Sequence, residues 1–184
     1  MKALLDACVL YPTVMREMLV GVAAAGLFEP LWSPRILEEW ARAAARLGPG
    51  QEALARGEIV ALNARFRVAS VRPRAGDEAR LWLPDPADVH VLAAAIAGSA
   101  DVVVTLNAQD FPRHTLAEEG LRRDAPDLFL RAIWADHPAA VQGVALAVQG
   151  EAERLSGEPW PMRSLMKKAR LPRLGKAMEA AGLR

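Results

Sequence analysis

Residues 83 to 112, "LPDPADVHVLAAAIAGSADVVVTLNAQDFP", limit most strongly what this chain can fold into. Asp85 and Pro86 form a helix start, and the Ala-rich run after them continues the helix to Gly98. After a short turn, residues 101–106 are rich in β-branched and apolar residues behind an acidic first residue. A strand of this kind is typical of the centre of a parallel sheet, which helices cover on both faces. The segment therefore predicts an α/β fold with a central parallel sheet.

The rest of the chain alternates short apolar runs with helical patterns, as that fold requires. We predict further strands at residues 2–5, 27–32 and 68–71. Helices are predicted at residues 13–26, from Ser33 to about Gly48, at 52–66, and through most of the chain from Leu116 onward, with a linker at 157–161 and a break between two short helices at Pro172.

Composition limits the size and setting of the protein. At 184 residues, 52% of them hydrophobic, the chain is long enough for one domain with a small appendage. A formal net charge of +1 excludes a global attraction to nucleic acid, so a basic surface must be local, as in the tail from Arg163 to Arg184 with its seven Lys or Arg residues. The single cysteine, Cys8, suits a reducing compartment, and no signal peptide or membrane-spanning run is recognisable. We therefore expect a cytoplasmic protein.

Carboxylates flank the two best-defined strands. Asp6 follows the strand at 2–5, Asp110 lies in the loop after the strand at 101–106, and Asp88 lies in the first turn of the preceding helix. Because ligands bind at the carboxyl ends of parallel strands, we expect Asp6 and Asp110 to share one edge if their strands are neighbours. Hard oxygen ligands without Cys or His partners suit Mg²⁺ or Mn²⁺, and such an ion supports phosphoryl transfer.

The same acids have structural interpretations that the sequence leaves open. Asp6 can satisfy backbone N–H groups at a strand-to-helix turn. Asp88 stands three residues after Asp85, which is the spacing of a capping box at a helix start. Asp110 and Asn107 also fit an ordinary turn.

Two further acids and one histidine complete the candidates. Glu38 and Glu39 lie on the helix that begins at Ser33, and one of the two is expected on a solvated face. His90 follows Asp88 closely, but a lone His on an apolar helix is more often packed than a ligand. Cys8 is interpreted as a small buried residue and not as a nucleophile.

Four segments together resemble the PIN-domain ribonucleases, in particular the toxins of VapBC-type toxin–antitoxin pairs. They are "LLDACVLYP", "WSPRILEEWAR", "LPDPADVHVLAAAI" and "DVVVTLNAQDF", and the last two are the most specific. The resemblance covers about residues 1–130. It implies a three-layer α/β/α sandwich around a central parallel sheet, here residues 1–138, and leaves residues 139–184 as a helical, basic C-terminal extension.

The resemblance also implies a reaction and its residues. The expected activity is that of an endoribonuclease that hydrolyses RNA phosphodiester bonds with Mg²⁺ or Mn²⁺. Glu39 is preferred over Glu38 as the second acid, because "WAR" after it aligns best with the family. Asn107 stands where some members have another Asp, which implies weaker metal binding or a single tightly held ion. The implied catalytic and metal-binding residues are Asp6, Glu39, Asp88 and Asp110, supported by Thr105 and Asn107.

The implied partners are the RNA substrate, a cognate antitoxin and a second copy of the chain in a homodimer. An antitoxin Arg inserted among the acids would block the site through charge-assisted hydrogen bonds. The alternatives are a PIN nuclease with a housekeeping role in RNA processing and a non-catalytic PIN-like RNA-binding module. A haloacid-dehalogenase-like phosphatase is disfavoured, because it needs an Asp where Cys8 stands.

Overall fold

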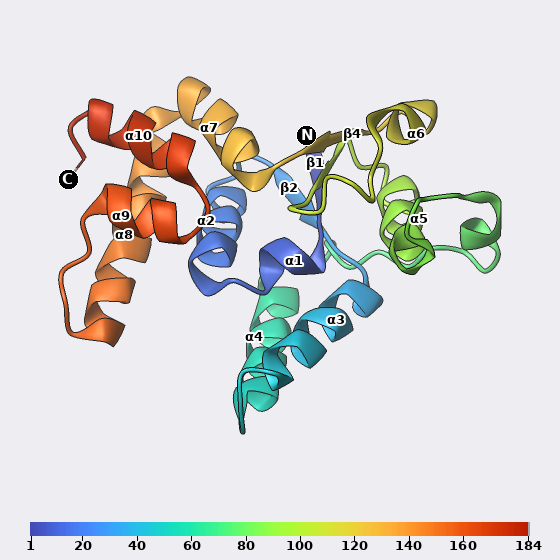
Figure 1. Cartoon of the computed structure of the whole chain (residues 1–184), viewed down its shortest axis with the longest axis horizontal. Helices are drawn as coiled ribbons and strands as arrows, with labels where there is room; N and C mark the ends of the chain where they lie inside the picture. The colour runs from blue at the N-terminus through green and yellow to red at the C-terminus, as the bar shows by residue number, and fades with distance from the viewer. Residues whose placement is uncertain (184) are drawn as a thin grey trace. The chain divides into compact units, whose positions relative to one another are not determined.

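Four short strands form one parallel sheet in the computed structural model, which describes residues 1–183. The spatial order is β2-β1-β3-β4, so the two apolar strands β1 and β3 lie at the centre. Every pair of neighbours is parallel. The bounds are β1 Lys2–Leu5, β2 Glu29–Leu31, β3 Val102–Val104 and β4 Arg122–Asp124. The predicted fold class, α/β with a parallel sheet and a helical C-terminal part, is confirmed (Figure 1).

The chain divides into two compact units, and each unit is built from two separate segments. The first unit comprises Met1–Tyr11 and Phe28–Asp124, and the second comprises Pro12–Leu27 and Ala125–Arg184. The boundary expected after residue 138 falls inside the second unit. The division into a nuclease domain, residues 1–138, and a basic helical extension, residues 139–184, stays a prediction.

In the first unit, helices connect the strands and pack beside them. Helix α5 contacts both central strands, as expected for a helix that is apolar on almost every side. Ser33 caps α3, because its hydroxyl accepts a 3.2 Å hydrogen bond from Ile36 N. The helices are α1 Ala7–Leu10, α3 Pro34–Ala45, α4 Gln51–Arg65, α5 Val89–Ala97 and α6 Arg113–Glu118, with 3₁₀ turns η1 Asp77–Arg80 and η2 Pro86–Asp88.

Two sequence predictions for this unit were wrong. Residues 68–71 form no strand and make a single parallel bridge, between Ser70 and Trp32. The strand β4 was missed, because "RRD" lacks the apolar character by which strands are recognised and the region was predicted to be helical. As the edge strand, β4 needs only backbone pairing with β3, in the register Val103↔Arg123.

The second unit is entirely helical, and its predicted linker and its break at Pro172 are confirmed. Helix α2 packs against α8 so closely that a Cβ on Gly21 would lie 2.5 Å from Val144 Cγ1. The buried carboxylate of Asp127 accepts hydrogen bonds of 2.9–3.1 Å from the backbone N–H groups of Arg173 and Leu174 and so caps α10. The helices are α2 Thr13–Ala24, α7 Pro126–Asp136, α8 Pro138–Ser156, α9 Met162–Lys168 and α10 Pro172–Ala180.

None of the helices within residues 1–183 combines the length and the apolar character that a membrane crossing requires.

Candidate metal centre

The carboxyl ends of β1 and β3 bring Asp6 and Thr105 together. The two strands pair in the register Leu5↔Val104, so the next residues of each strand face one another. Thr105 Oγ1 donates a 2.6 Å hydrogen bond to Asp6 Oδ2, and the Cys8 thiol donates to the same oxygen at 3.0 Å. Asp6 is only 7% exposed. The strands at 2–5 and 101–106 are neighbours, which is the condition under which Asp6 and Asp110 were expected to share one edge.

The Cys8 thiol belongs to this arrangement as a donor. Burial raises the pKa of Cys8 to about 12, and the neighbouring Asp6 carboxylate acts in the same direction. The thiol therefore keeps its proton at neutral pH and is a poor nucleophile.

A cluster of three aspartates lies around the entry to α5 and the loop after β3. One carboxylate oxygen from each of Asp85, Asp88 and Asp110 lies within 4.8 Å of the other two. Asp85 also accepts a 2.8 Å hydrogen bond from Ala87 N and so caps η2. Two of the predicted acids, Asp88 and Asp110, are thus brought together with a third that the sequence assigned to capping alone.

Asp6 acts on this cluster through its charge. The pKa of Asp88 is raised from 3.8 to about 6, first by burial and then by the carboxylates of Asp6, Asp85 and Asp110. Within residues 1–183, no Lys or Arg forms an ion pair with any of these four acids. The donor set is therefore made of hard oxygens that repel one another. It fits a divalent cation such as Mg²⁺ or Mn²⁺, which would relieve the repulsion.

Asn107 links the two halves of the site. Its backbone N–H donates to Thr105 Oγ1 at 2.9 Å, and its side-chain amide donates to Asp88 Oδ2 at 3.3 Å. The amide adds a donor where a carboxylate would add another repelling charge near Asp88. Thr105 and Asn107 thus lie beside Asp6 and Asp88, and their supporting role stays a prediction.

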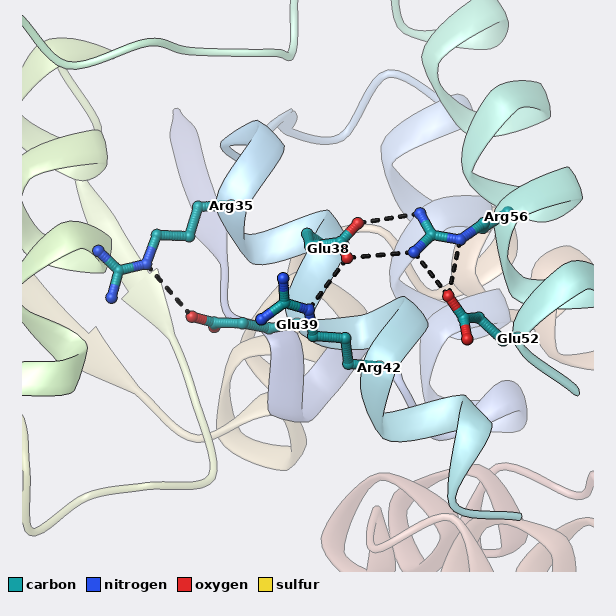
Figure 2. Close-up of polar contacts among 6 residues, drawn as sticks. All are labelled: Arg35, Glu38, Glu39, Arg42, Glu52 and Arg56. Atoms are coloured by element: carbon teal, nitrogen blue, oxygen red, sulfur yellow. Dashed lines mark hydrogen bonds and ion pairs between the residues drawn. The ribbon is translucent and has the colours of Figure 1, made fainter. Parts of the chain in front are cut away.

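The two acids of α3 point in opposite directions, as Figure 2 shows. Glu38 faces α4, where Arg56 binds it through two hydrogen bonds of 2.9 and 3.1 Å and Arg42 adds a third. These bonds lower the pKa of Glu38 to about 2. Glu39 faces the other side, with its Oε1 3.6 Å from Arg35 Nε and 2.8 Å from His90 Nε2.

Glu39 is therefore next to α5 but is not joined to the aspartates. In residues 1–183, no hydrogen bond or ion pair connects it to Asp6, Asp88 or Asp110. His90, which contacts Glu39, follows Asp88 by two residues in the chain. The assignment of Glu39 as the second acid stays a prediction.

One sequence comparison found a match. A family model described as the PIN domain matches residues 2–109, which is more than half of the chain and includes Asp6, Glu39 and Asp88. Searches of curated proteins and of solved structures returned no match.

Proposed function

Because this chain belongs to the PIN-domain family, we propose that it is a Mg²⁺- or Mn²⁺-dependent endoribonuclease that hydrolyses RNA phosphodiester bonds. The observation that carries the proposal is the self-repelling carboxylate cluster at the ends of β1 and β3. Buried and half-buried acids without cationic partners are costly unless an ion binds them. The raised pKa of Asp88 reflects that repulsion together with burial.

Asp6, Asp88 and Asp110 would hold the ion, with Glu39 completing the set and Asp85 close enough to contribute. A bound ion of this kind activates a water and neutralises charge that develops on the phosphate. The chain's own residues fix the ligands in place. Thr105 holds Asp6 by its 2.6 Å hydrogen bond, and Asn107 bonds both Thr105 and Asp88.

We further propose that the enzyme is the toxin of a toxin–antitoxin pair and acts as a homodimer. The support is the resemblance of its four motifs to toxins of the VapBC type. The acidic cluster has no ion-paired Arg within residues 1–183, so an antitoxin Arg would find unpaired carboxylates there. A housekeeping RNA-processing nuclease would have the same site. Expression in cells distinguishes the two, because a toxin with Asp6 intact should arrest growth and its Asp6→Asn variant should not.

The test is a cleavage assay on total RNA with Mg²⁺, with Mn²⁺ or with chelator, followed by mapping of the new ends. We expect cleavage with the metals and none with chelator. Asp6→Asn should lose about a hundredfold or more in rate and remain folded. Glu118→Gln is the matched control, since it removes an exposed carboxylate of the first unit outside the cluster.

The non-catalytic alternative predicts a different result. A PIN-like RNA-binding module whose acids no longer bind metal would take up no Mn²⁺ in calorimetry and would bind RNA equally well with Asp6 or Asn at position 6. Those two outcomes together would contradict the nuclease proposal and support the RNA-binding module.

A further inference from the structure

The edge strand β4 carries two adjacent arginines, and side chains alternate between the two faces of a strand. Arg122 is exposed and shares its face with Asp124, with 3.3 Å between Nε and Oδ2. Arg123, on the other face, is half-buried, and within residues 1–183 no carboxylate forms an ion pair with it. A guanidinium that is partly removed from water without an acidic partner needs other hydrogen-bond acceptors.

Arg123 finds these acceptors in the loop that follows β3. Its Nη1 donates hydrogen bonds to the backbone carbonyl oxygens of Ala108 and Phe111, the second at 3.0 Å. These two residues stand on either side of Asp110 in the sequence. The guanidinium therefore binds the backbone before and after a candidate metal ligand and leaves the carboxylate of that ligand unpaired.

The same loop is fixed at both of its ends. At its start, the backbone N–H of Asn107 donates to Thr105 Oγ1 at 2.9 Å. At its end, the side chain of Phe111 is fully buried. Between these points Asp110 is half-buried, and one of its carboxylate oxygens lies within 4.8 Å of an oxygen from each of the other two acids in the aspartate cluster. The position of this carboxylate thus depends on the path of the backbone that Arg123 binds.

We propose that Arg123 is a positioning residue for the metal site, which holds residues 108–111 and so places the Asp110 carboxylate against Asp85 and Asp88. Its charge is taken up by neutral carbonyl groups, so the acids keep their negative charge for a cation. A residue that orients a metal ligand contributes strongly to the affinity of the site. This inference rests on the proposed function, since it assumes that the aspartate cluster holds a divalent ion.

The matched variants are Arg123→Met and Arg122→Met, which remove neighbouring guanidinium groups from β4 and keep a long side chain. Calorimetry measures their Mn²⁺ affinity. Each substitution removes one positive charge, and this loss alone would make a cation bind more tightly in both variants. Positioning has the opposite sign, so we expect Arg123→Met to weaken Mn²⁺ binding about tenfold or more. Arg122→Met should bind Mn²⁺ at least as tightly as the wild type.

Arg123→Lys is the conservative variant, because it keeps the positive charge and N–H donors on a flexible stem. It should restore part of the Mn²⁺ affinity that Arg123→Met loses. Circular dichroism in chelator checks that the variants are folded. We expect all three to keep the sheet, since β4 pairs with β3 through backbone groups that no substitution removes.

Hydrogen exchange in chelator, followed by mass spectrometry, provides a measurement that needs no metal. A loop that loses its hydrogen bonds to Arg123 opens more often, so its amide groups should exchange faster. We expect faster exchange over residues 106–111 in Arg123→Met and wild-type exchange there in Arg122→Met.

Two outcomes would overturn the role of Arg123. One is Mn²⁺ affinity that rises equally in both Met variants, and the other is loop exchange that Arg123→Met leaves unchanged. RNA cleavage by the wild type is measured separately. If the wild type binds Mn²⁺ without cleaving RNA and Arg123→Met binds Mn²⁺ more weakly, the nuclease proposal fails and the positioning role is supported.

Discussion

The Thr105 hydroxyl donates a 2.6 Å hydrogen bond to Asp6 across two neighbouring strands. The same oxygen accepts a hydrogen bond from the backbone N–H of Asn107. Thr105 and Asp6 are 99 positions apart in the chain and meet because β1 and β3 are paired in parallel. One hydroxyl therefore sets the orientation of a buried carboxylate and the start of the loop that carries Asp110. We therefore expect Thr105 to position the acids, so that its loss disturbs the whole acidic edge.

Thr105→Val keeps the shape of the side chain and removes both hydrogen bonds. We expect the free energy of unfolding to fall by about 1–3 kcal/mol, because Asp6 loses a donor in a buried place. Mn²⁺ affinity should fall about tenfold or more, as is typical when a residue that orients a metal ligand is lost. Urea unfolding and calorimetry measure the two effects. Thr105→Ser should restore most of both, and a Val variant that binds Mn²⁺ like the wild type would refute the positioning role.

Glu38→Gln and Glu39→Gln form a matched pair on adjacent residues of α3. Glu38 is held by Arg56 and Arg42, so its substitution should weaken the packing of α3 on α4 slightly and leave RNA cleavage unchanged. Glu39→Gln should lower the cleavage rate by about a hundredfold with little change in stability. Cleavage rates and urea midpoints of both variants decide between them. Reversed effects would make Glu38 the second acid.

Asp88→Asn tests the electrostatic cost of the cluster. The folded-state pKa of about 6 exceeds the usual 3.8, so the folded protein binds the proton more tightly than the unfolded chain does. Metal-free wild-type protein should therefore lose stability as pH rises from about 4 to about 6. The Asp88→Asn variant should not show this loss of stability, because its amide at position 88 does not titrate.

In chelator, the Asn variant should be more stable than the wild type at pH 8, and the difference should shrink at pH 4. With saturating Mn²⁺ at pH 8 the order should reverse, since the ion stabilises only the protein that binds it. Denaturant titrations at the two pH values measure this. A wild type that is insensitive to pH between 4 and 6 would contradict the prediction.

Asp127→Ala tests the buried cap in the second unit. The carboxylate of Asp127 accepts three hydrogen bonds from the N–H groups of Arg173 and Leu174 at the start of α10. Without it, we expect a loss of about 2 kcal/mol in the free energy of unfolding, because these N–H groups lose a charged partner. Circular dichroism during urea unfolding measures the loss, and Asp136→Ala, an exposed acid at the end of α7, is the control. Equal stability of the two variants would contradict the role of the cap.

Neutralising the basic C-terminal helices tests whether they contact RNA. Truncation after residue 158 would remove α9 and α10 together with their buried side chains, so point substitutions are the cleaner change. Replacing the exposed Lys167, Arg170 and Lys176 by Gln should weaken RNA binding and reduce the salt slope by about 0.7 for each phosphate that the variant no longer neutralises. Anisotropy titrations between about 50 and about 200 mM salt measure the slope.

The control for this triple variant replaces the exposed Arg46, Arg67 and Arg131 by Gln, which gives the same change of net charge. A salt slope that falls equally in both variants would show that only net charge matters. A slope that is unchanged in the first variant would exclude the C-terminal helices from the RNA-binding surface.

The parts of the fold that were predictable from sequence are those in which local pattern and burial agree. β3 is three fully buried valines, and α5 is a run of apolar residues interrupted only by His90 and followed by Gly98, so both were recognised. β4 failed because an edge strand of Arg, Arg and Asp is defined by its neighbour and not by its own composition.

The candidate site shows the same division. Asp6, Asp88 and Asp110 could be selected from their places relative to predicted strands and helices. Asp85 was assigned to capping, and it does cap η2. The sequence around it therefore gave no reason to expect that it also lies beside Asp88 and Asp110. Which of Glu38 and Glu39 faces the site depends on the packing of α4 against α3, which is a contact between separate helices.

The interleaving of the two units has a practical consequence. Helix α2 belongs to the second unit but is inserted in sequence between β1 and β2. A chain that ended at residue 124 would keep α2 and lose its helical partners, leaving the buried Met15, Met18, Leu19 and Val22 exposed to water. Truncating the chain after residue 124 is therefore not expected to give the first unit as a stable fragment that stays free of aggregation. Obtaining the first unit alone would require an internal deletion that joins residue 11 to residue 28 with a short flexible linker.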